Sequence, residues 1–349
     1  MRPGSIVLIT VVLAAGCGGS QTTQPPVSAS PSVSPAPSMA AANCPQPSAL
    51  PAGVLASIPL QPGDRPVGIA TGFGSVWVES HEGHTLYRID PASNTVIARI
   101  DLGQFSAGDP GIGFGRVWVA HNILDSTTTL VVDPTSNQVV GRIQAATLDF
   151  TFASGSVWMA SNYFDSLLRI DPATYQVVAS IKVSGDQGTL MYGAGFIWKA
   201  ANSEPGGYSG VITKIDPSTN EVVGALHTAR LPGRYPQGII FAFGAIWVKA
   251  YNNDRLLRID PASGKTIAYT IPHFSPPSQY FEVFIGSDSS SLWMRTADCA
   301  ISQVNPDTGQ VVATYPADPN GGGGHQTIGF GSLWLTNFGS DVVWRDKIP

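Results

Sequence analysis

The side chains best suited to chemistry recur at one place in a sequence pattern, shortly before a run of small and apolar residues that ends in tryptophan. Aligned on the tryptophans, these positions hold carboxylates, amides and an imidazole: Asp109, Asp149, Gln187, Gln237, Glu282 and His325. Such oxygen and nitrogen groups bind divalent cations or polar organic molecules. If the fold brings them together, we expect a site for a polar ligand or for a cation, magnesium or calcium. The alternative is a set of solvated loop residues.

A second polar group is compact in the sequence. Glu79, His81, Glu82 and His84 follow the first tryptophan of the pattern within a few residues. Imidazole and carboxylate groups can bind zinc, but a spacing of three residues needs a helix or a suitably folded loop to converge. Asparagines follow most of the other tryptophans and indicate hairpin turns rather than ligands.

Two long segments carry residues typical of recognition. Segments 226–238 and 270–284 combine arginine, tyrosine, phenylalanine and histidine with several prolines. Aromatic and arginine side chains in surface loops suit the binding of a sugar, peptide or cell-wall polymer. No nucleophile elbow, phosphate loop or catalytic triad can be found by motif, so the catalytic residues of any enzyme activity are unknown from the sequence.

The elements that position these residues follow from a repeat of about 40 residues. Its first marker is a Gly- or Ser-rich turn followed by tryptophan, as in GFGSVW, and its second is an Ile-Asp-Pro turn followed by a valine-rich run, as in IDPASNTVIARI. The turn residues close hairpins, and Asn94, Asn137, Asn220, Gly264 and Gly309 suit their left-handed positions. Each repeat therefore predicts four antiparallel strands, and the tryptophans, one per repeat, are expected to wedge neighbouring sheets.

The ends of the repeat predict how the ring closes. Seven tryptophans mark seven repeats, at positions 77, 118, 158, 198, 247, 293 and 334. The last repeat stops after Trp344-Arg345-Asp346, where Asp346 is taken as the remaining marker acid, and lacks an outer strand. Residues 54–60, ahead of the first repeat, match one. We expect an all-β, seven-bladed β-propeller in which this N-terminal strand completes the last blade and removes the open edge.

The beginning of the chain predicts export and a lipid anchor. Residues 1–16 have the form of a signal peptide, and Leu13-Ala14-Ala15-Gly16-Cys17 resembles a lipobox with Cys17 as the lipidated residue. Residues 17–43 form a Ser-, Pro- and Ala-rich segment expected to be a disordered tether, and residues 44–349 the propeller. The expected location is the extracytoplasmic face of the cell membrane. An ordinary secreted protein is the alternative.

The remaining cysteines and the charge limit partners. Cys44 and Cys299 are an even pair in an oxidising compartment and are expected to form a disulfide rather than a metal site. The formal net charge is −5 and charged residues are 12% of the chain, so no basic surface for nucleic acid is present. The sequence does not fix the oligomeric state.

The strings GFGSVWV and RIDPASNTVIARI resemble YVTN-type propeller repeats of exported bacterial proteins, a superfamily that includes the streptogramin B lyases. The resemblance implies a seven-bladed propeller. The lyases cleave their substrate with the help of magnesium, and their site resembles a Glu-x-His-Gly motif with another Glu three residues after a blade tryptophan. Here the matching places read Arg65-Pro66-Val67-Gly68 and Tyr235-Pro236-Gln237-Gly238, and Glu79 lies two rather than three residues after Trp77. We therefore expect a ligand-binding or scaffold protein, with a metal-dependent lyase or hydrolase as the alternative.

Overall fold

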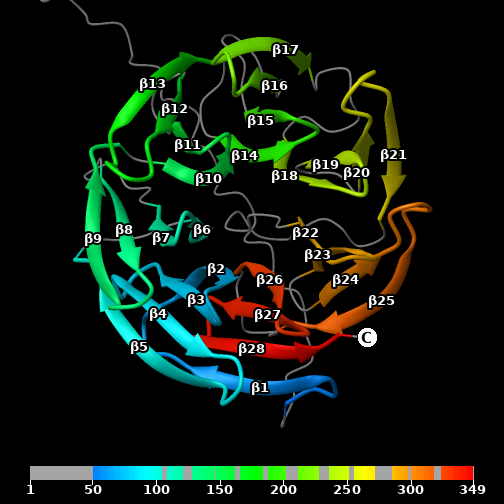
Figure 1. Cartoon of the computed structure of the whole chain (residues 1–349). Coiled ribbons are helices and arrows are strands. Elements are labelled where there is room, and N and C mark those ends of the chain that lie inside the picture. Colours follow the sequence, from blue (N-terminus) through cyan, green and yellow to red (C-terminus); the bar gives the residue numbers. More distant parts are fainter. Residues whose placement is uncertain are drawn as a thin grey trace, which may run out of the picture. The chain divides into compact units, whose positions relative to one another are not determined.

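Each repeat folds into one four-stranded antiparallel sheet, and the sheets surround a central axis (Figure 1). The computed structural model describes residues 50–103, 108–120, 128–145, 147–161, 166–183, 188–201, 211–227, 236–250, 255–271, 285–297, 300–317 and 324–348. Seven such sheets, or blades, are present in these ranges, which confirms the predicted fold class. No helix in the same ranges has the length and apolar character needed to cross a membrane.

The strands run from the axis outward in chain order, except that the outermost strand of blade 7 is β1. Blades 1 to 3 contain β2 Pro66–Gly72, β3 Ser75–Ser80, β4 Thr85–Asp90, β5 Thr95–Asp101; β6 Gly111–Gly113, β7 Arg116–Val119, β8 Thr129–Asp133, β9 Gln138–Ile143; β10 Thr147–Ala153, β11 Ser156–Ser161, β12 Ser166–Ile170 and β13 Val177–Lys182. Blades 4 and 5 contain β14 Gly188–Gly193, β15 Phe196–Ala201, β16 Val211–Asp216, β17 Glu221–His227; β18 Pro236–Ala242, β19 Ala245–Ala250, β20 Arg255–Ile259 and β21 Thr266–Thr270. Blades 6 and 7 contain β22 Ile285–Ser287, β23 Leu292–Ala297, β24 Ala300–Val304, β25 Val311–Pro316; β26 Gln326–Gly329, β27 Ser332–Asn337, β28 Val342–Lys347 and β1 Val54–Pro59.

Each blade has two distinct ends. At the turn end, tight hairpins join the first strand to the second and, in blades 1 to 6, the third to the fourth; at the loop end lie the other connections. The predicted left-handed residues are confirmed, with φ between 56° and 71° at Asn94, Asn137, Asn220, Gly264 and Gly309. Asn and Gly adopt this conformation most readily, which explains their place in the repeat.

The seven repeat tryptophans are structural. Their exposed fractions are 0 to 1%. Six donate the indole Nε1–H to the carbonyl oxygen five residues earlier, at 3.0 to 3.2 Å, and so stabilise the turn before their own strand. Trp293, whose turn is one residue longer, donates instead to Asp288 Oδ2 at 2.8 Å. Every polar atom of the wedge is therefore satisfied inside the blade, as buried indoles require.

Arginines on third strands link neighbouring blades. Arg88 stacks over Trp77, with its Cζ 5.1 Å from the ring centroid, and donates to Ser75 Oγ in its own blade. Its Nη1 reaches blade 2, where it donates to Pro134 O at 2.6 Å and to Asn137 Oδ1 at 2.9 Å. Arg169 and Arg345 make the equivalent contacts. The Asp-Pro-x-x-Asn turn is therefore also an acceptor site for the preceding blade.

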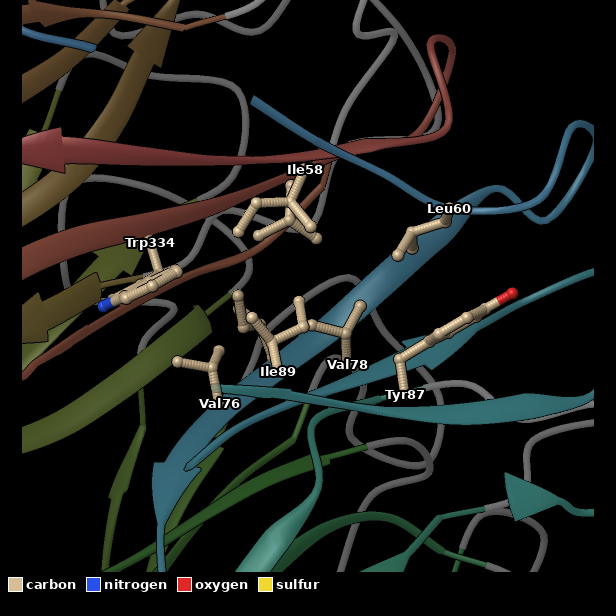
Figure 2. Close-up of a cluster of buried hydrophobic side chains, with 9 residues drawn as sticks. Ile58, Leu60, Val76, Val78, Tyr87, Ile89 and Trp334 are labelled. Atoms are coloured by element: carbon tan, nitrogen blue, oxygen red, sulfur yellow. The ribbon is translucent and has the colours of Figure 1, made fainter. Parts of the chain in front are cut away.

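The predicted closure by the N-terminal strand is confirmed. β1 pairs with β28. Ile58 in β1 and Leu60, which directly follows the strand, are 3% and 6% exposed. They pack against Val76, Tyr87 and neighbouring side chains of blade 1 (Figure 2). The first and last parts of the ring thus share one hydrophobic core.

The sequence assignment of Asp346 as a turn acid is wrong. In the register, Asp346 pairs with Leu333 and Arg345 with Trp334, as Ile89 pairs with Val76 and Arg88 with Trp77 in blade 1. Asp346 therefore occupies a core position, and its exposed fraction is 0%. The alignment fails because the last repeat lacks the Pro that marks the turn.

The three cysteines lie outside the described residues, so lipidation of Cys17 and the Cys44–Cys299 disulfide stay predictions. Ala297 and Ala300, which flank Cys299, pair with each other at the loop end of blade 6. Gly53 accepts a hydrogen bond from Lys347 at the turn end of blade 7. Gly53 and the Ala297–Ala300 pair therefore lie at opposite ends of their blades.

Candidate functional site

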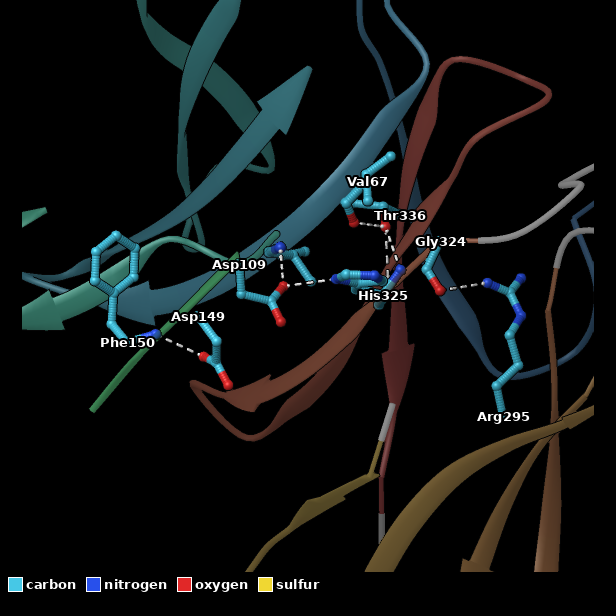
Figure 3. A network of polar contacts seen from close by, with 9 residues as sticks. Val67, Asp109, Asp149, Phe150, Arg295, Gly324, His325 and Thr336 are labelled. Atoms are coloured by element: carbon cyan, nitrogen blue, oxygen red, sulfur yellow. Dashed lines mark hydrogen bonds and ion pairs between the residues drawn. The ribbon is translucent and has the colours of Figure 1, made fainter. Parts of the chain in front are cut away.

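The structure brings two of the predicted site residues into contact at the loop end. His325 Nδ1 lies 2.9 Å from Asp109 Oδ1, although the residues belong to blades 7 and 2 (Figure 3). The same Oδ1 accepts the backbone N–H of Ile69, in the innermost strand of blade 1, at 2.8 Å. Asp109 therefore joins three consecutive blades next to the axis.

The position of His325 is fixed from its own blade and the next. Its backbone N–H donates to Thr336 Oγ1 at 2.7 Å, and Thr336 donates to Val67 O in blade 1 at 2.6 Å. The His325 side chain is 3% exposed, whereas the Asp109 side chain is 16% exposed. Among the described residues, Asp109 Oδ2 accepts no hydrogen bond. Only Oδ1 takes part in the contacts that hold this side chain in place.

Close backbone packing supports this arrangement. A Cβ atom on Gly68 would lie 1.7 Å from the carbonyl oxygen of Gly108, so blades 1 and 2 approach each other here as only glycine allows. Asp109 follows Gly108 directly, and the close approach carries its carboxylate to the amide of Ile69.

Asp149 is near the axis but serves a different pair of blades. Its Oδ2 accepts the N–H of Leu190 in blade 4 at 2.7 Å, and its Oδ1 accepts the N–H of Phe150 at 2.7 Å. On the other side of His325, Arg295 Nη1 donates to Gly324 O at 3.1 Å and links blade 6 to blade 7. The polar residues near the axis therefore hold inner strands together (Figure 3).

The remaining predicted site residues are only partly placed. Gln237 is the second residue of β18, but its side chain lies outside what the structure describes. Gln187 and Glu282 lie outside the described residues, as do residues 228–235 and 272–284 of the two recognition segments. Their part in a ligand site stays a prediction.

Sequence reasoning missed buried charges on the second strands, since it singled out only Glu79, and that as a possible zinc ligand. Two residues after the tryptophan, blades 1, 5 and 6 have Glu79, Lys249 and Arg295, with exposed fractions of 0%, 0% and 8%. Blades 2 to 4 have alanine there, at positions 120, 160 and 200. Lys199, one residue after Trp198, is also 0% exposed. The break in the alanine pattern is the signal that could have found them.

The described residues do not fit a divalent cation. No group of three or more His, Cys, Asp or Glu side chains gathers in these ranges. Both oxygens of Asp149 and one of Asp109 already accept hydrogen bonds, mostly from backbone amides. In the proposed zinc group, His81 Nδ1 lies 3.5 Å from Glu82, and Glu79 is buried in the second strand. Metal sites of this kind need at least three converging ligands.

Comparison with known proteins gives a fold but no family. No family model matches the chain, and no curated protein matches it either. Among solved structures, virginiamycin B lyase from Staphylococcus aureus is similar, with a TM-score of 0.66 and 14% identity over 84% of this chain and 99% of that one. The chain shares its propeller fold. Kuenenia stuttgartiensis hydrazine synthase (TM-score 0.69, 13% identity, 82% and 97% covered) and the computationally designed Ika8 protein (0.59, 11%, 83% and 98%) are also similar. At such identities the likeness concerns the fold alone, and the function rests on the site.

Proposed function

We propose that this protein is a lipid-anchored extracytoplasmic propeller that binds a polar ligand at the loop end, where blades 7, 1 and 2 meet. The observation that carries the proposal is the contact between His325 and Asp109, which leaves Asp109 Oδ2 without a partner among the described residues. Partly buried carboxylates make strong, charge-assisted hydrogen bonds to ammonium, amide and hydroxyl donors. A peptide or cell-wall polymer offers such donors.

The location rests on the sequence. The order of a short apolar run, small residues and Cys17 supports lipidation at the outer face of the membrane. A Cys17→Ser variant is expected to lose incorporation of labelled palmitate and to change its distribution between membrane and soluble fractions. Equal labelling of both proteins would contradict the anchor.

The binding test uses solubilised peptidoglycan fragments as the probe in titration calorimetry. Asp109→Asn keeps an oxygen that can accept from Ile69 N–H but removes the charge, so the fold should be retained while affinity falls roughly ten- to a hundredfold. Asp307→Asn makes the same change at an exposed turn on the opposite end and is the control. Binding that Asp109→Asn leaves unchanged, or no binding at all, would contradict this ligand class.

One observation also favours an enzyme, the alternative function. An imidazole oriented by a carboxylate is the arrangement used for general acid–base catalysis, since the carboxylate fixes the ring and its tautomer. Incubation with virginiamycin B, followed by mass spectrometry, tests the lyase reading. Product formed by the natural chain but not by His325→Gln would support it.

A further inference from the structure

Three phenylalanines protrude from the turn end of adjacent blades. Phe330, Phe73 and Phe114 occupy the same position in the hairpin between the first and second strands of blades 7, 1 and 2. Their exposed fractions are 44%, 40% and 45%, and no other phenylalanine in the described ranges is as exposed. They form an apolar arc around the axis, at the opposite end from the Asp109 site. We call them the Phe arc.

The backbone at these positions disfavours phenylalanine. The φ angles of Phe73, Phe114 and Phe330 are 52°, 52° and 53°, in the left-handed region where a bulky side chain is strained. Two-residue hairpins of this shape favour Asn, Asp or Gly at this place. Blades 3 and 4 show that the ring is not required, since they have Ser154 and Ala194 there with similar φ angles.

Burial accounts for only part of each phenylalanine of the arc. Phe243, in the same turn of blade 5, packs against the core between blades 5 and 6. The members of the Phe arc are instead 40 to 45% exposed, although Phe114 also makes an edge-to-face contact with Phe152 of blade 3, with the ring centroids 6.0 Å apart. A strained and exposed aromatic residue that recurs on adjacent turns indicates a surface that binds an apolar partner.

The chain enters the ring at this same end. Val54, the first residue of β1, pairs with Asp346, and Lys347 donates to Gly53 O at 2.9 Å. Lys347 also pairs with Ser332, which directly follows the Phe330-Gly331 turn. The residues that precede Gly53 therefore join the fold on the turn end of blade 7 (Figure 1 shows β1 and β28 side by side).

We propose that the turn end of blades 7, 1 and 2 docks on the lipid bilayer and inserts the Phe arc into its interface. The inference rests on the proposed lipid anchor, because a tether keeps the propeller at a high effective concentration beside the bilayer, where a weak apolar contact on this face is enough to dock it. The rings offer hydrocarbon area and no polar group that could orient a hydrogen-bonded ligand, and this suits acyl chains better than a sugar or a charged peptide. The loop end, with the Asp109 site, then faces away from the bilayer.

The test measures bilayer affinity without the anchor. The chain from Gly18, which retains every strand of the described fold, is floated with vesicles of phosphatidylcholine. Phe73→Ser/Phe114→Ser/Phe330→Ser should weaken partitioning by on the order of tenfold or more. The control Ile97→Ser/Val178→Ser/Val312→Ser removes apolar side chains of 52%, 56% and 57% exposure from outer strands and should change partitioning little.

Other results would overturn the proposal. Flotation that both triple variants lose equally would mean nonspecific adsorption, and no flotation of the natural sequence would mean that the face has no bilayer affinity. Dimerisation that depends on the Phe arc, measured by analytical ultracentrifugation, would assign the face to a second copy of the chain. Because the assay omits Cys17, none of these results bears on lipidation, and none involves the Asp109 site. Thermal unfolding of each variant checks that the fold is retained.

Discussion

At the scale of single residues, Asp346 is an acidic side chain at an apolar core position. The other blades have Ile or Val at this strand position, at 89, 132, 170, 215, 259 and 304. Neither Asp346 oxygen accepts a hydrogen bond in the described part of the chain. Burial raises the pKa of Asp346 from 3.8 to about 7. The carboxyl group therefore lies where the fold would be more stable with an apolar side chain.

This raised pKa predicts how stability changes with pH. Below pH 4 Asp346 is protonated in both the folded and the unfolded chain, so ionisation of this group does not lower the free energy of unfolding. Between pH 4 and 7 only the unfolded chain releases the proton, so the free energy of unfolding falls as pH rises; above pH 7 the loss is complete. Asp346→Leu should therefore add on the order of 2–4 kcal/mol to the free energy of unfolding at pH 8 and much less at pH 4.5.

Urea unfolding of Asp346→Leu and of the natural chain at the two pH values checks this prediction. Asp307→Asn, at an exposed turn, should leave the pH dependence unchanged. An equal gain from Asp346→Leu at pH 4.5 and pH 8 would show that packing, and not the ionised carboxylate, accounts for the effect.

Residue-level sequence reasoning succeeded where the signal was local and failed where it depended on register. The left-handed turn residues and the buried tryptophans could be predicted because each fits its conformation or its wedge position wherever the repeat lies. Asp346 was misplaced because a shift of one residue exchanges a core position for a turn position. Arg345, which aligns with Arg88, held the information that would have fixed the register.

At the scale of elements, an arginine that reaches from one blade to the next helps to hold neighbouring sheets together. Arg88 joins β4 of blade 1 to the turn between β8 and β9 of blade 2 by two of its three hydrogen bonds. Replacing it with methionine keeps most of the stacking on Trp77 but leaves the buried acceptors unmatched. We expect Arg88→Met to lower the free energy of unfolding by about 1–3 kcal/mol.

The change should be local as well as global. Hydrogen exchange of the Asn137 amide, which donates to Asp133 O in this turn, should become faster in Arg88→Met. Arg142→Met, on the exposed outer strand of blade 2, is the matched control and should change stability by less than about 0.5 kcal/mol. Equal effects of the two substitutions would contradict a role for Arg88 between blades.

Element-level prediction of the site was limited by long-range contacts. Alignment of the repeats could place Asp109 and His325 beside the innermost strands, since each follows from its distance to a tryptophan. It could not pair them, because their contact crosses blade 1 and depends on the close approach of Gly68 and Gly108. Nor could it show that Asp149 binds a backbone amide of blade 4, which depends on how far one sheet is rotated from the next.

At the scale of the whole molecule, stability depends on the contacts between the two ends of the ring. β1 covers the edge of β28, and Ile58 and Leu60 fill the core that blades 7 and 1 share. A closed ring has no terminal blade that can unfold first, so all blades should unfold together. Open repeat arrays can instead unfold from an end, one unit at a time.

The double variant Ile58→Ala/Leu60→Ala tests this closure. Loss of the two buried side chains should cost on the order of 5 kcal/mol, a large share of what a propeller of this size can spare. With β1 released, hydrogen exchange at increasing urea should show β26, β27 and β28 losing protection before β14, β15 and β16, whereas in the natural chain both groups lose it together. Leu55→Ala, on the same strand but 52% exposed, should change neither stability nor the order of unfolding. If the double variant still unfolds in one step, the contacts between blades at the axis, including His325 with Asp109, are sufficient to keep the ring cooperative without its outer strand.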